Sequence, residues 1–359
     1  MKKNIVAVDL GNLNVKSFSN NKEEIFANGI RKFKRGDDTD LFGRKVDVDT
    51  YTISDETGED TYVIGDFHKG NSYMYSMNPD RYTHPDFKRL MLIAVFKHVK
   101  KNKQKVTLVT GLPSNHYELE EPHTALKALC GTYKVNNLEF TVEEVIVEQQ
   151  ALATAIYLGA DLKGNIKKDS EVFLNAEVLS INIGMGTTEV AVLYQGKIDS
   201  YFSLSSKANM HSAYDMIIQK IRETKDENEK VLVPSTLEIR KQDVEEQIRK
   251  QSGAKKVIYE ASNGAKIEIT NYIDESYKTT TDQVFKELKD NNLAFENYSG
   301  VILAGGGVVN LIDYIKQELI AYKDNNSVRF TLPDSLEFSV ARGYFVKGMI
   351  LNNGAGVVS

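Results

Sequence analysis

The sequence contains few of the residues that build disulfide frameworks or flexible linkers. Its 359 residues include one cysteine, Cys130, and six prolines. A single cysteine excludes an internal disulfide and is typical of a reducing compartment, so we expect a cytoplasmic protein. The shortage of proline and the lack of any low-complexity tract argue against long disordered linkers.

Long apolar runs and an excess of positive charge are also missing. The longest apolar run, Leu90–Phe96, is too short to cross a bilayer, and Asp9 interrupts the first apolar run too early for a signal peptide. The net charge of -5 gives no sign of a nucleic-acid surface. The dense basic cluster Lys97–Lys105 has no interleaved aromatic residues, and we interpret it as a solvated helix end. We therefore expect neither membrane attachment nor direct nucleic-acid binding.

One sequence pattern occurs twice along the chain. In Val6–Phe18 and again in Val178–Leu204, an apolar strand ends in a polar side chain, Asp9 or Asn182, and a glycine follows two residues later. Small polar residues, an alternating strand, a tight polar turn and a further strand come next, which predicts a hairpin in each copy. Because 359 residues with a hydrophobic fraction of 41% suffice for two cores, the repeat predicts two duplicated domains whose hairpin tips face each other.

Strands and helices alternate through the rest of the chain. Lys105–Pro113 is predicted to be a strand, and Glu143–Ala160 a strand that turns into an alanine-rich helix ending at Gly159. This alternation predicts an α/β fold with mixed sheets. Further predicted elements are a hairpin turning at Asn263-Gly264, a strand and a helix joined by three glycines in Gly300–Leu319, and a returning helix in Leu336–Leu351.

The loops that follow these strands carry groups that suit phosphate. A glycine at a hairpin tip exposes backbone N–H groups as a nest for phosphate oxygens, and Lys16 adds a positive charge. Asn12 and Asn14 can donate their side-chain amides. Because Asp9 would repel a bare phosphate, its presence predicts a Mg²⁺ between them, held through waters. The opposing nest is predicted at Gly184, Gly186 and Thr187, and close approach of adenine or its ribose at Gly305, Gly306 and Gly307.

Each of these signals is weak by itself. A strand ending in Asp-x-Gly is commonly a capped turn, and three glycines are as typical of a close helix–strand crossing as of a ligand site. The specificity comes from the order of four elements. They are a hairpin with D-x-G, a glutamine-rich strand-to-helix junction, a hairpin with G-x-G-T-T, and a strand-GGG-helix unit.

Three motifs add a family resemblance to this order. Thr107–Pro113 (TLVTGLP), Gly184–Val192 (GMGTTEVAV) and Ala341–Gly348 (ARGYFVKG) resemble the ParM-type plasmid-segregation actins, within the superfamily of actins, heat-shock chaperones and sugar kinases. The resemblance covers nearly the whole chain and implies an actin-like fold of two ribonuclease H-like domains around a nucleotide cleft. Domain I would span 1–168 with an insert near 30–85, domain II 169–334 with a helical insert near 239–297, and 335–359 would return to domain I.

The resemblance also implies which residues bind the cofactors. These cofactors would be Mg²⁺, with Asp9 on the metal side, and ATP, with GTP as the alternative because a glycine loop reads purine shape. The implied nucleotide residues are Asp9, Gly11, Asn12, Leu13, Asn14 and Lys16 in the first loop, Gly184, Met185, Gly186 and Thr187 in the second, Gly305, Gly306 and Gly307 in the adenosine loop, and Arg342 near it.

The junction Val147–Gly159 (VEQQALATAIYLG) resembles the actin stretch whose glutamine positions the attacking water. Matching a glutamine followed by a small residue selects Gln150 as the catalytic residue, with Glu148 and Gln149 as neighbours that a shift of register would promote. Chaperone-like relatives favour Glu148, since they carry a glutamate there. The sequence departs from the family at Asn182, where aspartate is usual, so we expect the nucleotide site to persist and hydrolysis to be slow.

Three functional classes follow from the superfamily. The first is an ATPase that polymerises with itself when it binds ATP and segregates plasmid or phage DNA through an adaptor protein. The second is a small-molecule kinase, which needs a catalytic aspartate where the junction offers amides and one glutamate. The third is a chaperone-type regulator, which we do not expect because we expect no room after the last helix for a peptide-binding domain. We expect the first class and keep the kinase as the alternative.

Overall fold

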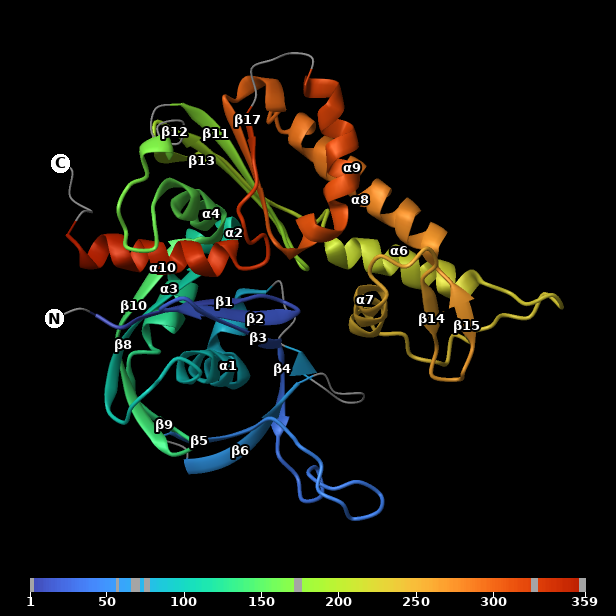
Figure 1. The fold of residues 1–359 in the computed structure, drawn as a ribbon, viewed down its shortest axis with the longest axis horizontal. Coiled ribbons are helices and arrows are strands. Elements are labelled where there is room, and N and C mark those ends of the chain that lie inside the picture. The colour runs from blue at the N-terminus through green and yellow to red at the C-terminus, as the bar shows by residue number, and fades with distance from the viewer. Residues whose placement is uncertain are drawn as a thin grey trace.

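The computed structural model of the 359-residue chain describes residues 3–55, 58–65, 72–73, 78–170, 176–323 and 329–354. Its strands form a ten-stranded sheet, a five-stranded sheet and a separate two-stranded hairpin. Helices lie against both larger sheets and in the space between them (Figure 1). The predicted α/β class is confirmed.

The larger sheet combines a mixed core with an antiparallel extension. Strand β1 pairs antiparallel with β2 and parallel with β8, and β8 pairs parallel with β10. In sheet order the strands are β3 (Lys22–Ala27), β2 (Asn14–Ser19), β1 (Ile5–Leu10), β8 (Gln104–Leu112), β10 (Leu138–Gln149), β9 (Gly131–Val135), β5 (Thr50–Asp55), β6 (Gly58–Ile64), β4 (Gly29–Lys32) and β7 (Ser72–Tyr73).

The five-stranded sheet repeats the core of the larger one. Its first three strands pair antiparallel with one another, and the last two strands are added in parallel. The strands β3-β2-β1-β8-β10 of the larger sheet have the same order of antiparallel and parallel pairings. In sheet order they are β13 (Lys197–Ser206), β12 (Thr188–Tyr194), β11 (Glu177–Ile183), β16 (Gly300–Ala304) and β17 (Arg329–Thr331). The duplication predicted from the two hairpins is therefore confirmed at the level of strand order and direction.

The turns of the two hairpins are also alike. Asn20 and Asn21 connect β2 to β3 with φ values of 49° and 63°, and Gln195 and Gly196 connect β12 to β13 with φ values of 50° and 72°. Two successive residues with positive φ are typical of the tight turns that match the twist of paired strands. The predicted hairpin at Asn263-Gly264 forms too, between β14 (Ile258–Glu260) and β15 (Lys266–Glu268).

The two largest hydrophobic clusters of the described residues hold most of the helices on these sheets. The larger sheet curls around α1, whose apolar residues pack against β1, β5, β8 and β10 (Figure 1). The five-stranded sheet is covered by α6, α8 and α9. The helices are α1 (Pro85–Phe96), α2 (Ser114–Tyr117), α3 (Glu120–Lys127), α4 (Gln150–Gly159), α6 (Met210–Glu223), α7 (Lys241–Lys250), α8 (Thr270–Asp290), α9 (Gly306–Lys323) and α10 (Ser339–Asn352), with short 3-10 turns η1 (Pro79–Thr83), η2 (Lys168–Ser170) and η3 (Phe295–Asn297).

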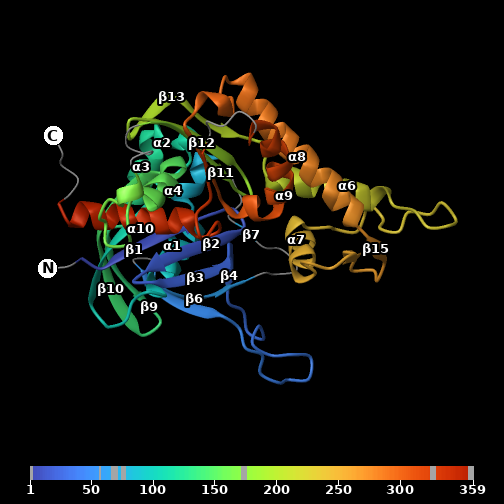
Figure 2. The ribbon, with the colours of Figure 1, turned by 45° about the horizontal axis from the view of Figure 1, so that its top comes forward.

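Helices α4 and α10 each follow a strand of one sheet in the chain but pack against the other sheet. Helix α4 follows a strand of the larger sheet, yet Ala155 packs against the five-stranded sheet. Helix α10 follows β17 of the five-stranded sheet, yet Tyr344 and Phe345 pack against the larger one. The two helices cross so closely that a Cβ on Gly343 would overlap the backbone of Ala153. The halves are therefore joined by two tightly packed helices, which lie between the sheets in both views (Figures 1 and 2).

Among the helices of the described residues, none combines the length and the apolar character that a membrane span requires. Segments 56–57, 66–71, 74–77, 171–175 and 324–328 lie outside the described residues, so parts of the predicted insert near 30–85 and of the predicted 168/169 boundary region lie outside them too.

Candidate nucleotide site

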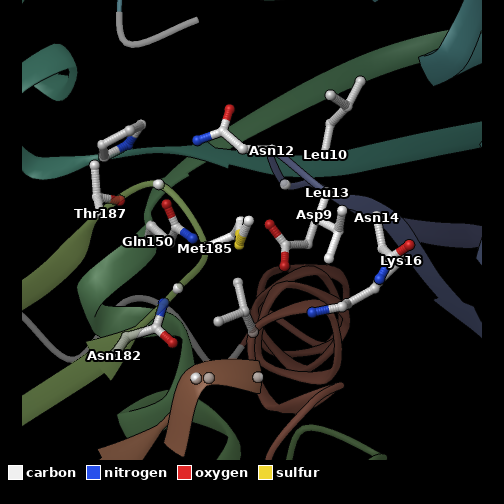
Figure 3. Close-up of a pocket in the computed structure, with 18 of the residues that line it drawn as sticks. Asp9, Leu10, Asn12, Leu13, Asn14, Lys16, Gln150, Asn182, Met185 and Thr187 are labelled. Carbon is white, nitrogen blue, oxygen red and sulfur yellow. The ribbon is translucent and has the colours of Figure 1, made fainter. Parts of the chain in front are cut away.

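A pocket lies between the two halves, at the ends of the strands that lead into the three glycine loops. It brings together most of the residues predicted from the sequence, and Asp9, Lys16, Gln150 and Asn182 surround one central space (Figure 3). The predicted residues that line it are Asp9, Gly11, Asn12, Leu13, Asn14, Lys16, Gln150, Asn182, Gly184, Met185, Gly186, Thr187, Gly305, Gly306 and Gly307.

Asp9 and Lys16 form the charged part of the first loop. The β1–β2 register places Lys16 directly opposite Asp9, so the two side chains share one face of the hairpin. Burial raises the pKa of Asp9, and the positive charges of Lys16 and Arg81 oppose that rise. The Lys16 ammonium reaches across to the third loop, where a Cβ on Gly306 would lie 3.7 Å from it. One loop thus presents a carboxylate and a cation to the same space.

The second loop is a tight turn that opens toward the first. The Gly184 N–H donates to the Thr187 carbonyl at 2.8 Å, and Asn209 donates its amide to the Gly186 carbonyl at 2.7 Å. Asn182 is the last residue but one of β11, beside this turn, and the residue is 3% exposed. Its Oδ1 has no hydrogen-bond partner among the residues that the structure describes. A buried acceptor without a donor indicates a site that a water or a bound group completes.

In the third loop, two glycines allow a close crossing of the backbone and the remaining one faces the pocket. Gly305 has φ +94°, and a Cβ there would overlap Asn182 Oδ1 and the Ile183 carbonyl. A Cβ on Gly307 would lie 2.7 Å from the Ile183 side chain. These two positions therefore require glycine because the β16–α9 connection crosses the end of β11 closely. Gly306, by contrast, faces Lys16.

A hydrated Mg²⁺ suits the oxygen atoms of this pocket. No cluster of three or more histidine, cysteine or acidic side chains suited to a metal occurs within the described residues. Mg²⁺ usually keeps several waters and binds through one or two carboxylates and the phosphates of a substrate. The half-buried Asp9 carboxylate and the unpartnered Oδ1 of Asn182 are oxygen donors of that kind. They would hold the ion through its waters, and the ion would neutralise phosphate charge.

The junction between β10 and α4 separates the three candidate catalytic residues. Gln150 lines the pocket as the first residue of α4. Glu148 is outside the pocket lining and pairs with Lys347 of α10 at 2.7 Å, while Gln149 donates to Ser114 Oγ at 3.1 Å. Alternation along β10 sends successive side chains to opposite faces, and α4 begins where this alternation ends. The structure thus favours Gln150 over its neighbours as the group facing a substrate, and its role stays a prediction.

Arg342 does not lie at the pocket, so the expected position beside the adenosine loop is wrong. Its Nε donates to Glu23 of β3 at 2.8 Å, and its Nη1 donates to both carboxylate oxygens of Asp334 at 3.1 Å. Tyr157 of α4 donates to Asp334 at 2.5 Å within the same group. Arg342 projects from the face of α10 that meets β3 and α4, and there it links the two halves.

Two buried ionisable residues, Arg81 in the pocket lining and Glu189 behind it, have no counterpart among the residues predicted from the sequence. Arg81 lines the pocket from η1 and donates to Leu10 and Asn12 of the first loop. Glu189 lies opposite Asn182 in the β11–β12 register and accepts from the Ser114 N–H at 2.9 Å and from Ser205 at 2.6 Å. Burial raises its pKa. Hairpin register could have placed Glu189, whereas no local pattern points to Arg81.

Comparison with known proteins bears on the fold. Residues 7–152 match the family described as the N terminal domain of actin like proteins. No curated protein sequence matches. A solved structure of the apo psk41 ParM protein is 17% identical, covers 99% of this chain and 100% of its own, and has a TM-score of 0.69.

The chain has the fold of the actin-like proteins. Another similar structure is the pCBH ParM non-polymerisable quadruple mutant, which is 19% identical in sequence. The match covers 96% of this chain and 99% of that chain, with a TM-score of 0.70. A third is Bacillus thuringiensis ParM with ATP, which is 15% identical in sequence. The match covers 98% of this chain and 100% of that chain, with a TM-score of 0.63. The expected resemblance to ParM-type actins is confirmed for the fold, and the actin-like fold spans both halves of the chain.

Proposed function

We propose that this actin-like protein binds ATP with Mg²⁺ in the pocket between its halves and then polymerises head to tail. The observation that carries the proposal is the meeting of two glycine loops, one from each half, around Asp9 and Lys16. Backbone N–H groups from both loops and the Lys16 ammonium suit the phosphates. The base would lie toward Gly305, Gly306 and Gly307.

Binding in such a pocket favours one relative orientation of the halves. A ligand shifts a conformational equilibrium by its difference in affinity for the two states, and phosphates held by both loops bind the closed state better. A fixed orientation makes every subunit alike, so a head-to-tail contact can repeat. A similar structure is described as a non-polymerisable ParM mutant, which supports polymerisation as a property to test here.

An exposed apolar tip supports self-association on this chain's own surface. Leu41 is fully exposed and Phe42 is 83% exposed, on a loop that projects from the body of the molecule (Figures 1 and 2). The loop is held in shape because Asp40 accepts from the backbone N–H groups of Phe42 and Arg44 at 2.8 and 2.9 Å. An ordered loop that presents two large apolar side chains fits a contact with another copy.

Hydrolysis by this site would be slow and would destabilise the polymer. Gln150 would orient the attacking water, while Asn182 keeps an oxygen acceptor near the metal and lacks the charge of aspartate. Partition of plasmid or phage DNA through a DNA-binding adaptor is the cellular role we propose. An adaptor is required because the net charge of -5 gives no electrostatic basis for direct DNA binding.

Light scattering of purified protein tests this function against the kinase alternative. We expect scattering to rise above a threshold protein concentration when ATP and Mg²⁺ are present, and to stay low without nucleotide. Transfer of phosphate to a member of a sugar panel, with no scattering at any concentration, would instead establish a small-molecule kinase.

A further inference from the structure

Arg81 fixes which end of the Asn12 side chain faces the pocket. Its Nη1 donates to Asn12 Oδ1 at 2.7 Å, and its Nη2 donates to the Leu10 carbonyl at 3.1 Å. A guanidinium carries only donors, so the amide oxygen of Asn12 must face it and the NH₂ group must face away. The fork of Arg81 therefore sets the rotamer of a side chain in the first loop.

The NH₂ group of Asn12 spans the gap to the second loop. A Cβ on Gly186 would overlap Asn12 Nδ2, so the amide lies directly against the backbone of that loop. Figure 3 shows the Asn12 nitrogen pointing toward the loop that carries Met185 and Thr187. The amide donor thus sits between the two nests, where a phosphate bound by both loops would need donors.

The position of Arg81 is itself well supported. Its side chain is buried, and the guanidinium lies 5.8 Å from the ring centre of Tyr82 and 5.7 Å from that of Phe87. Its backbone belongs to η1, which begins at Pro79 and is capped by Asn78. Contact with two aromatic rings, burial and a capped backbone turn leave the guanidinium few alternative positions. Such a residue can orient another side chain without moving itself.

We propose that Arg81 is a positioning residue that holds the Asn12 amide so that its N–H donates to the terminal phosphate of ATP. The proposal rests on the proposed function and adds a source of preference for ATP over ADP. ADP lacks the phosphate that reaches the gap between the loops, so it gains less from this donor. Arg81 acts through Asn12, and the effects of the two residues are therefore coupled.

A double-mutant cycle tests this coupling with ATP–Mg²⁺ and ADP–Mg²⁺ as the probes. We expect Arg81→Met and Asn12→Ala each to weaken ATP binding about tenfold, the typical effect of one hydrogen bond to a charged group, and to weaken ADP binding less. The double variant should bind ATP about as well as Asn12→Ala alone, because residues that act as a unit are not additive. Losses that multiply to about a hundredfold in the double variant would overturn the proposal.

Two further variants separate positioning from folding and from charge. Arg81→Lys keeps the charge and loses the fork, so we expect it to weaken ATP binding and to be non-additive with Asn12→Ala. Arg89→Met removes an arginine that pairs with Asp86 outside the pocket lining, and ATP affinity should stay unchanged. If the wild type binds no ATP–Mg²⁺, the proposed function fails and this inference with it. If it binds ATP and the cycle is additive, only this inference fails.

Discussion

At the scale of single residues, Asp9 shows a conflict between stability and binding. Its carboxylate is half-buried, and loss of solvation there raises its pKa above the ordinary value of 3.8 even though Lys16 and Arg81 lie nearby. The folded state therefore holds the Asp9 proton more tightly than the unfolded state does. As pH rises from about 3.8 through the raised pKa, this difference lowers the free energy of unfolding.

Asp9→Asn should therefore stabilise the nucleotide-free protein and weaken ATP–Mg²⁺ binding. We expect the gain in unfolding free energy to grow with pH above the ordinary aspartate range and to level off once Asp9 is fully ionised. Denaturant unfolding at several pH values measures the gain, with Asp313→Asn as the control because that side chain is 81% exposed. A variant that is less stable than wild type at neutral pH would contradict this account.

Asn182 and Gln150 set the predicted rate of hydrolysis. Asn182→Asp introduces a negative charge beside the proposed metal site and should raise phosphate release by about tenfold or more, the usual effect of an outer-sphere metal partner. Gln150→Ala should lower it in either background, because orientation of the water is lost. Phosphate release under polymerising conditions measures both. An unchanged or lower rate in Asn182→Asp would show that asparagine is adapted to this site.

The sequence predicts those parts of the site that lie in consecutive residues. Asp9, Lys16 and Gly184 belong to loops whose chemistry is local, so their pattern alone places them. Arg81 reaches Asn12 from 69 positions along the chain, and only the folded η1 shows this contact. The position of Arg342 could not be predicted in the same way. Its motif predicts a helix, but it does not show which neighbouring elements each face of that helix contacts.

At the scale of elements, the crossing of α4 and α10 joins the halves. Gly343→Ala would drive a methyl group into the backbone of Ala153, and a backbone atom cannot rotate away. We expect a loss of about 1–3 kcal/mol in unfolding free energy, the usual cost of overpacking. Gly159→Ala at the end of α4 is the matched control, since a Cβ there meets open space and should cost nothing. Equal stabilities of the two variants would argue against a close crossing.

The order of strands and helices along the chain was easier to predict than the number of strands in the larger sheet. The two hairpins and the strand-glycine-helix unit follow from alternation and turn residues, and each of these elements forms. The continuation of the larger sheet through β9, β5, β6, β4 and β7 depends on pairing between strands that are distant in sequence. Such pairing leaves no local signal, so the insert near 30–85 could not be recognised as part of that sheet.

At the scale of the whole molecule, the apolar tip of Leu41 and Phe42 should matter only in the polymer. The double substitution Leu41→Ser and Phe42→Ser should raise the critical concentration at least about tenfold, since burial of one such side chain contributes about 1.5–3 kcal/mol. ATP affinity should be unchanged, because neither residue lines the pocket. The conservative pair Leu41→Ile and Phe42→Leu is the control and should polymerise nearly as wild type does. An unchanged critical concentration in the serine variant would exclude this tip from the contact.

Nucleotide bound between the halves is proposed to drive assembly, and negative-stain electron microscopy of the purified protein shows whether it does. Samples at a series of protein concentrations are compared with ATP–Mg²⁺, with GTP–Mg²⁺ and without nucleotide. We expect filaments above a threshold concentration with ATP–Mg²⁺ and dispersed subunits without nucleotide. Dispersed subunits at high concentration with both nucleotides, or filaments that form equally without nucleotide, would contradict it.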